Sequence, residues 1–220
     1  MHTHTHIHES PAQTEGRLIR WASFYDGLVN VMTLGYVRRL RVLTVDNALL
    51  QPGENILDVG CGTGAVTIPA KIRVGKNGGA AGIDPAPEMI AVARRKASRA
   101  GLEIDFRLGV IESLPFPDET FDAVTSSLMM HHLPEHVQVS GLAEIRRVLK
   151  SGGRLLIADM MRPDTSSFRR FFTSLAMHHS LQFGIEDLPK LLNEAGFEEI
   201  KQLDARFLTI GFVRATKPAR

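Results

Sequence analysis

The chain has 220 residues, of which 44% are hydrophobic and 23% are charged. These are ordinary values for a folded globular protein, and they exclude global disorder and a fibrous architecture. The 26 basic and 24 acidic side chains leave a formal net charge of +2, without the clustered basic excess of a dedicated nucleic-acid-binding protein. We therefore expect one compact domain with a short appendage, and no nucleic acid as its main partner.

Cysteine content and hydropathy bear on the cellular compartment. The single cysteine, Cys61, excludes an intramolecular disulfide. No hydrophobic signal segment is recognisable at the N-terminus, and no apolar run reaches the ~18 residues that suggest a membrane span. These features predict a cytoplasmic protein without a membrane span. The sequence leaves the oligomeric state open between a monomer and a homodimer.

The first part of the chain divides into a tail and a helical region. In residues 1–13 histidines alternate with other residues, and we expect a flexible tail rather than a metal site, because a polar terminus has no packing partner. Residues 14–50 carry apolar side chains at three- and four-residue steps, which predicts a helical lid. Residues 51–220 are then the main domain.

From Asn55 onward short apolar runs alternate with helical patterns, which is typical of successive βαβ units in a parallel sheet. The predicted strands are 56–59, 80–84, 104–108, 121–126 and 154–159, followed by an antiparallel pair at 198–204 and 207–216. Predicted helices lie at 65–74, 87–100, 168–182 and 186–195. One more helix carries Leu142, Ile145 and Leu149 on one face and is closed by Gly152-Gly153.

The strand at 56–59 runs directly into the segment Gly60-Cys61-Gly62-Thr63-Gly64 and then into a helix. Glycine is needed there because the turn is tight and because a ligand must approach the backbone more closely than a Cβ permits. A nucleoside cofactor is the natural ligand of such a loop. Asp84, at the predicted end of the next strand, is placed to bind both ribose hydroxyls.

The glycines alone do not identify the nucleoside. Gly60, Gly62 and Ala65 also match the G-x-G-x-x-G/A pattern of dinucleotide sites, so an NAD(P)-dependent oxidoreductase is an alternative. Asp58 favours a different ligand, because a carboxylate here would repel a pyrophosphate but suit a ligand with ammonium and sulfonium charges. The other role open to Asp58 is that of a strand-end carboxylate bonded to nearby backbone amides.

Four stretches, in this order and spacing, resemble the motifs of class I S-adenosylmethionine-dependent methyltransferases, within the methyltransferase-11-like group. They are Leu57 to Gly64, Gly82 to Met89, Leu114 to Asp118 together with Phe121 to Val124, and Leu149 to Leu155. The region before the glycine loop is similar to that of the ubiquinone and menaquinone C-methyltransferases. Its matching residues are Tyr25-Asp26, Met32 to Gly35 and Arg38-Arg39.

The resemblance implies a Rossmann-like α/β fold. Its seven-stranded, mostly parallel sheet would have the order 3-2-1-4-5-7-6, with the last strand antiparallel and helices on both faces. The cofactor would be S-adenosylmethionine, with Gly60 and its neighbours against the methionine part, Asp58 near its amino group and Asp84 on the ribose. The residues expected at the cofactor are Asp58, Gly60, Cys61, Gly62, Gly64, Asp84, Pro85, Met89, Val110, Ile111, Ser126 and Tyr25.

After the third strand the sequence departs from the family pattern. Many relatives have an acid after the glycine that binds the adenine amino group, whereas Gly109 is followed here by Val110-Ile111. We therefore expect backbone groups and the apolar side chains of Ile111 and Met89 to hold the adenine. Both side chains could instead be ordinary core residues, and Tyr25 could equally be a core aromatic rather than a cover over the cofactor.

Methyl transfer needs alignment, exclusion of water and, for some acceptors, a base. A hydroxyl, thiol or activated carbon acid must lose a proton, and a histidine that titrates near neutrality is suited to accept it. His131 and His132 follow the predicted fourth strand and are the candidate catalytic residues. Each could instead be structural, as could His178-His179, which lie in an apolar segment. No metal site is predicted.

The sequence thus predicts a methyltransferase that acts on an oxygen, sulfur or carbon nucleophile of a small-molecule acceptor. There is no Asn/Asp-Pro-Pro-Tyr/Phe motif after the fourth strand, which disfavours N-methylation of adenine or glutamine. The lone Cys61 disfavours arsenic methylation through several thiolates. A protein that binds S-adenosylmethionine without catalysis is a further alternative, because the glycines and Asp84 would be the same in both.

Overall fold

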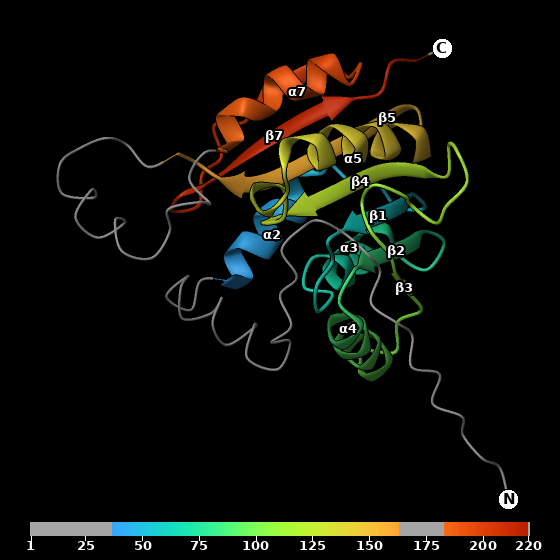
Figure 1. The fold of residues 1–220 in the computed structure, drawn as a ribbon. Helices are drawn as coiled ribbons and strands as arrows, with labels where there is room; N and C mark the ends of the chain where they lie inside the picture. Colours follow the sequence, from blue (N-terminus) through green and yellow to red (C-terminus); the bar gives the residue numbers. More distant parts are fainter. Residues whose placement is uncertain (1–36, 163–182, 220) are drawn as a thin grey trace, which may run out of the picture.

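The computed structural model describes residues 37–162 and 183–219 (Figure 1). The predicted tail, most of the predicted lid with Tyr25, and the segment with His178-His179 lie outside these residues. The predicted domain boundary after residue 50 stays a prediction.

A seven-stranded sheet with the order β3-β2-β1-β4-β5-β7-β6 forms the centre of the molecule (Figure 1). Its strands are β1 (Asn55–Val59), β2 (Gly79–Asp84), β3 (Asp105–Leu108), β4 (Phe121–Ser127), β5 (Leu149–Met160), β6 (Glu198–Gln202) and β7 (Ile210–Thr216). Neighbouring strands from β3 to β5 pair in parallel, whereas β7 is antiparallel to both β5 and β6. The strand order and the antiparallel β7 confirm the predicted fold.

Helices cover both faces of the sheet (Figure 1). On one face lie α2 (Val37–Asn47), α3 (Thr67–Val74) and α4 (Pro87–Arg99), and on the other lie α5 (Glu135–Val148) and α7 (Leu188–Glu194). Side chains of β1 alternate between the two layers, because successive residues of a strand point to opposite faces. Ile56 packs in the cluster with α2 and α3, whereas Leu57 and Val59 pack in the cluster with α5 and α7.

The helix α2 is held to the sheet at its C-terminal end. Leu40 and Val45 are buried in the cluster beneath this helix. The terminal carbonyls of a helix have no partner within the helix. Here carbonyls at the end of α2 and just beyond it accept hydrogen bonds from the guanidinium groups of Arg154 in β5 and Arg214 in β7. The end of the predicted lid region is therefore anchored to the core.

The largest difference from the predicted elements lies between α5 and β5. The predicted helix included Leu149 and ended at Gly152-Gly153, but α5 ends at Val148 and the two glycines lie inside β5. That prediction was wrong because Leu149 is extended and pairs with Phe121 of β4, although its side chain is as buried as a helical core residue would be. At such a junction, the spacing of apolar residues does not distinguish the end of a helix from the start of a buried strand.

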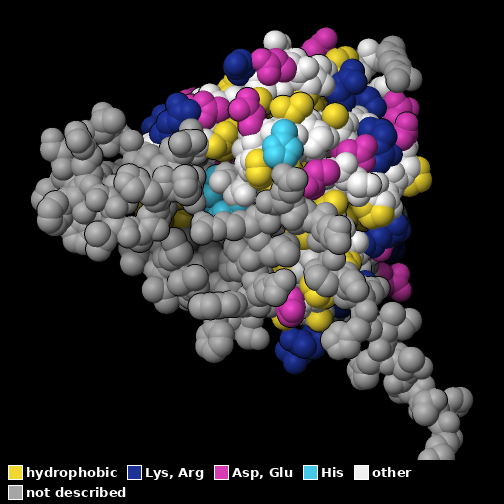
Figure 2. Space-filling model, viewed as in Figure 1, with side chains coloured by type: hydrophobic (Ala, Val, Ile, Leu, Met, Phe, Trp, Pro, Cys, Tyr) yellow, Lys and Arg dark blue, Asp and Glu magenta, His cyan; other side chains and the backbone are white. Residues whose placement is uncertain are grey.

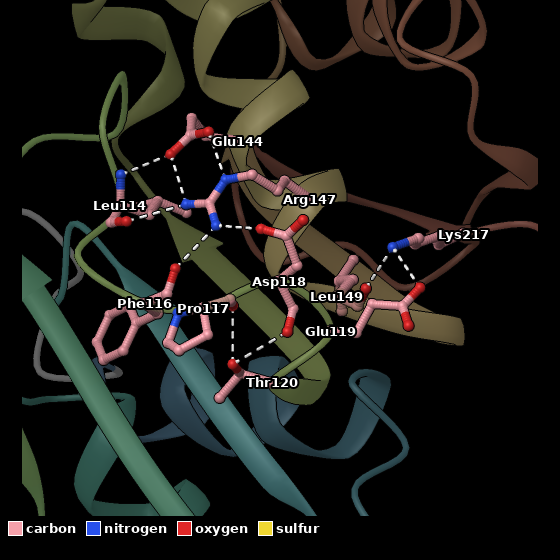
Figure 3. A network of polar contacts seen from close by, with 10 residues as sticks. All are labelled: Leu114, Phe116, Pro117, Asp118, Glu119, Thr120, Glu144, Arg147, Leu149 and Lys217. Atoms are coloured by element: carbon pink, nitrogen blue, oxygen red, sulfur yellow. Dashed lines mark hydrogen bonds and ion pairs between the residues drawn. The ribbon is translucent and has the colours of Figure 1, made fainter.

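Arg147 of α5 holds the chain segment that leads from β3 to β4 (Figure 3). Its guanidinium donates to the carbonyls of Leu114 and Phe116 at 3.0 and 2.8 Å, and it forms ion pairs with Glu144 and Asp118. Glu144 also accepts a hydrogen bond from the amide of Leu114 at 2.8 Å. The hydrogen bond from Arg147 lowers the pKa of Glu144. This network fixes one of the predicted family motifs against α5.

The surface of the face that carries α5 and α7 is mixed in character. Basic, acidic and apolar side chains are interspersed over its described part (Figure 2), in keeping with the net charge of +2. Within residues 37–162 and 183–219, no helix is both long enough and apolar enough to cross a membrane.

Candidate active site

The parallel strands β1 to β5 all end at the same edge of the sheet, where the loops that follow them meet. The register places Val59 of β1 beside Ile83 of β2 and beside Ser126 of β4. Because the chain runs from β1 outward to β3 and then returns to place β4 on the other side of β1, the switch point lies between β1 and β4. This is where open α/β sheets bind ligands.

The glycine loop after β1 needs glycine for two different reasons. Gly60, Gly62 and Gly64 have φ values of 73°, 51° and 77°, in the left-handed region that other residues rarely adopt. A Cβ on Gly60 would lie 2.7 Å from Cγ of Met129, and one on Gly64 would lie 3.0 Å from the ring of Phe106. At Gly62 an added Cβ would meet no atom of residues 37–162 or 183–219 within 4 Å. Gly62 is therefore the position at which the loop is open to a ligand.

The loop is pinned to the end of β2. The amides of Gly60 and Cys61 donate to the carbonyl of Ile83 at 3.0 and 2.8 Å. The amide of Gly62 donates to Oδ2 of Asp84 at 2.9 Å, and Oδ1 of Asp84 accepts from the amide of Ala86 at 2.9 Å. Burial raises the pKa of Asp84. Since each carboxylate oxygen has a second lone pair, Asp84 can still accept from the ribose hydroxyls.

Asp58 is buried beneath the loop, with 2% of its surface exposed. Its Oδ2 accepts a hydrogen bond of 2.6 Å from the Thr67 hydroxyl and its Oδ1 one of 2.9 Å from the Thr125 hydroxyl. Burial raises the pKa of Asp58 to about 6, although both threonines oppose the shift. The sequence did not single out the threonines, but Thr125 is the register partner of Asp58 on β4. Contact of Asp58 with a cofactor amino group stays a prediction.

Several predicted cofactor contacts are core residues in this structure. Met89 and Ile111 are 3% and 5% exposed, and Ile111 packs closely against Gly141 of α5. Cys61 is also buried, and its desolvation raises the pKa of the thiol, so the thiolate needed for reaction is disfavoured. Pro85 and Val110 are half-buried next to the ends of β2 and β3. The contacts predicted between these residues and the cofactor, those of Met89, Ile111 and Cys61 included, stay predictions.

The hydroxyl oxygen of Ser126 is a buried polar atom without a hydrogen-bond partner among the described residues. The residue is fully buried at the end of β4, and within the described residues its Oγ makes no hydrogen bond. A buried hydroxyl without a hydrogen bond costs free energy, and such groups in native proteins usually have a specific explanation. Ser126 lies beside Val59, the residue that immediately precedes the glycine loop. This position fits a polar contact between the hydroxyl and a bound ligand.

The histidine pair lies in the short 3-10 helix η1 (Met130–His132), just after β4. Nδ1 of His131 lies 2.5 Å from Oδ1 of Asp159, a fully buried residue near the end of β5. The ring of His132 lies against that of His131, with 3.9 Å between centroids. Asp159 was missed in the sequence, although an acid at the end of a predicted strand is the same signal that identified Asp84.

Among the described residues, no three His, Cys, Asp or Glu side chains lie close enough to hold a metal ion. Polar groups at this edge of the sheet include the backbone of the glycine loop, the carboxylates of Asp58, Asp84 and Asp159, the histidine pair and hydroxyls. Such a set matches an organic ligand with sugar hydroxyls and positive charge.

Comparison with known proteins decides between the nucleoside ligands. Residues 56–153 match the family model of the methyltransferase domain. A 2-phytyl-1,4-naphtoquinone methyltransferase of Synechococcus elongatus is 33% identical over 164 residues, which cover 74% of this chain and 70% of that protein. The chain belongs to the class I S-adenosylmethionine-dependent methyltransferases.

Two further similarities agree with this family. A demethylmenaquinone methyltransferase of Symbiobacterium thermophilum is 36% identical to this methyltransferase over 152 residues, which cover 68% of the chain and 59% of the relative. The crystal structure of an S-adenosylmethionine-dependent methyltransferase from Aquifex aeolicus matches with a TM-score of 0.70 at 22% identity. That match covers 89% of this chain and 97% of the other, and it supports the fold. The protein is an enzyme of this family, and the oxidoreductase alternative is set aside.

Proposed function

We propose that this methyltransferase transfers a methyl group from S-adenosylmethionine to an oxygen or carbon of a small, ring-hydroxylated acceptor of the quinone type. The observation that carries the cofactor part is the loop opening at Gly62 beside the carboxylate of Asp84. The names of the two relatives above, both quinone methyltransferases, support the acceptor part.

The residues present fit the cofactor. The backbone at Gly60 to Gly64 would face its methionine part, Asp84 its ribose, and Ser126 would gain a partner for its buried hydroxyl. The carboxylates of Asp58 and Asp84 complement a ligand with a sulfonium and an ammonium group, and they would repel a pyrophosphate. Burial of Asp58 strengthens this preference, because charges interact more strongly away from water.

When bound, S-adenosylmethionine supplies a methyl carbon that is activated by positively charged sulfur. The protein then has three tasks, which are to align the acceptor, to exclude water and to remove the acceptor's proton. The pair His131 and His132, at the carboxyl edge of the sheet, supplies the group that takes this proton. A hydroxylated ring gains most from such a base, since a phenol has a pKa of about 10 and is protonated at neutral pH.

The test uses the full chain with S-adenosylmethionine and a panel of reduced quinones, simple phenols and thiols. We expect release of S-adenosylhomocysteine and a methylated product by mass spectrometry with the reduced quinones or phenols. Preferential transfer to thiols would overturn the acceptor assignment. Binding of S-adenosylhomocysteine without transfer to any member of the panel would overturn the proposed activity and favour a binding protein.

The base is tested separately with His131→Ala and His132→Ala. At least one of the two variants should transfer methyl groups more slowly while its affinity for S-adenosylhomocysteine is preserved. If both variants keep the activity of the parent across neutral pH, neither histidine is the base.

A further inference from the structure

We infer that Asp159 holds the imidazole of His131 with its proton on Nδ1, which makes Nε2 of His131 the base that receives the acceptor's proton. This inference rests on the proposed function of the site. It distinguishes His131 from His132, which were equal candidates for the base in the sequence analysis. Asp159 is a positioning residue, because it acts on the acceptor only through His131.

The carboxylate of Asp159 is surrounded by donors. Its Oδ1 accepts a hydrogen bond of 2.7 Å from the amide of Met160, and its Oδ2 accepts one of 3.2 Å from the amide of His131. An amide can only donate, so both oxygens act as acceptors. An ionised carboxylate can only accept, so with Asp159 ionised the ring nitrogen Nδ1 of His131 is the donor in the 2.5 Å contact with Oδ1.

The tautomer follows from this contact. A neutral imidazole carries a single N–H, so a proton on Nδ1 leaves a lone pair on Nε2. Within the described residues no group hydrogen-bonds Nε2 of His131. When Nε2 takes a proton, the positive ring stays in contact with the negative carboxylate of Asp159, which is fully buried. The hydrogen bond that orients the ring is therefore kept throughout the transfer.

The position of His131 suits a base for methyl transfer. Only 7% of its side chain is exposed, so the ring is largely shielded from bulk water. Met129, two positions earlier in the same turn, packs against Gly60 of the glycine loop. Gln138 fixes the turn by donating to the carbonyls of Met130 and Leu133. The histidine is therefore tied to the loop that is expected to hold the cofactor.

The proposed transfer breaks one bond for each bond that it forms. The acceptor's hydroxyl proton passes to Nε2 of His131, and the electron pair of that O–H bond stays on the acceptor. The acceptor's oxygen, or a ring carbon conjugated with it, forms the new bond to the methyl carbon as the carbon–sulfur bond breaks. The electron pair of the broken bond goes to sulfur, which becomes a neutral thioether. His131 later returns its proton to solvent.

Two described titratable groups contact the ring of His131, namely Asp159 from β5 and His132 from the same turn. Asp159 is the group that hydrogen-bonds the ring, so a variant of Asp159 should change which ring nitrogen carries the proton as well as the rate.

The first test needs no acceptor. The full chain with 15N-labelled histidine is studied by nuclear magnetic resonance, and His131→Gln identifies the signals of that ring. We expect the neutral ring of His131 to carry its proton on Nδ1. In Asp159→Asn the population should shift toward the Nε2-protonated form. A parent protein with the proton on Nε2 would overturn the inference, whatever its activity.

The second test is kinetic and uses Asp159→Asn with a series of phenols of decreasing pKa. The maximal rate with an ordinary phenol should fall by about 10² to 10⁴, the range of general base catalysis, with little change in the KM of the acceptor. The loss should shrink for the most acidic phenols, which need less help from a base. A loss of equal size for all phenols would indicate a merely structural role and overturn the inference.

A control separates local effects from general ones. His136 is an exposed histidine on α5, and His136→Ala should behave like the parent in both tests. Binding of S-adenosylhomocysteine by calorimetry distinguishes the two proposals. If the parent does not bind it, the proposed function fails, whereas intact binding with the wrong tautomer in His131 removes only the role of Asp159.

Discussion

The carboxylate of Asp84, at the end of β2, accepts a hydrogen bond of 2.9 Å from the amide of Gly62 in the loop after β1. The acid predicted to bind the ribose therefore also fixes the glycine loop at the position where a ligand can approach. Its other oxygen is held by the amide of Ala86, so the carboxylate has little freedom to rotate. The two hydrogen bonds therefore fix the orientation of the carboxylate relative to the glycine loop.

Replacing Asp84 by alanine should weaken cofactor binding for two reasons. The variant loses the expected bonds to the ribose, and it frees the loop at Gly62. We expect the free energy of S-adenosylhomocysteine binding to become less favourable by about 1–3 kcal/mol, measured by calorimetry. Glu194→Ala on the exposed side of α7 is the control and should bind like the parent. Unchanged affinity in Asp84→Ala would reject the assigned role.

A pair of glycine variants separates backbone strain from ligand contact. Gly62 and Gly53 both have positive φ values, and at either position an added Cβ would meet none of the described residues within 4 Å. Gly62→Ala and Gly53→Ala should therefore destabilise the fold by similar amounts, about 1–2 kcal/mol each, in urea unfolding. Only Gly62→Ala should lose affinity for S-adenosylhomocysteine, because its methyl group enters the ligand's space. Equal affinities in the two variants would place the ligand elsewhere.

The pH dependence of stability tests the burial of Asp58. Burial raises its pKa from 3.8 to about 6, so the folded state binds this proton more tightly than the unfolded state does. The resulting stabilisation is fully present below the unfolded pKa and is lost as the pH rises through about 6. Asp58→Asn has no such loss. Its free energy of unfolding, relative to the parent, should rise by up to about 3 kcal/mol between pH 4 and pH 8.

Urea unfolding at several pH values measures this difference for Asp58→Asn. Plotted against pH, the free energies of unfolding of the variant and the parent should diverge between pH 4 and pH 7 and should run parallel above pH 7. Curves that stay parallel over the whole range would show that the carboxylate of Asp58 is better solvated than the structure indicates.

Arg147 should contribute to stability without contributing to cofactor binding. Its side chain is 30% exposed, and it donates to two carbonyls and to the carboxylates of Glu144 and Asp118 (Figure 3). Arg147→Ala should lower the free energy of unfolding by about 1–3 kcal/mol, since charge-assisted hydrogen bonds are among the stronger ones. The control Lys190→Ala removes an exposed pair at 3.8 Å and should cost very little. A similar small loss in both variants would contradict the importance of the network.

Local pattern was enough to predict the fold. The apolar run at 56–59, the glycines that follow it and Asp84 are features of neighbouring residues, and they fix a strand, a tight turn and the end of the next strand. The order of the motifs along the chain then implied the strand order that the sheet has. Among the described residues, periodicity failed most clearly where a helix passes directly into a buried strand, at Leu149.

Pairs that form across the sheet could not be predicted from the sequence. Thr125 meets Asp58, and Asp159 meets His131, because parallel strands stand in a particular register and their ends coincide. Such contacts depend on the packing of residues far apart in the chain, which no local pattern records. Composition, glycines, acids and the resemblance of four motifs to a known family thus predicted what kind of protein this is. Tertiary structure decided which of two adjacent histidines has a buried carboxylate against its Nδ1, because only folding brings β5 beside the turn after β4.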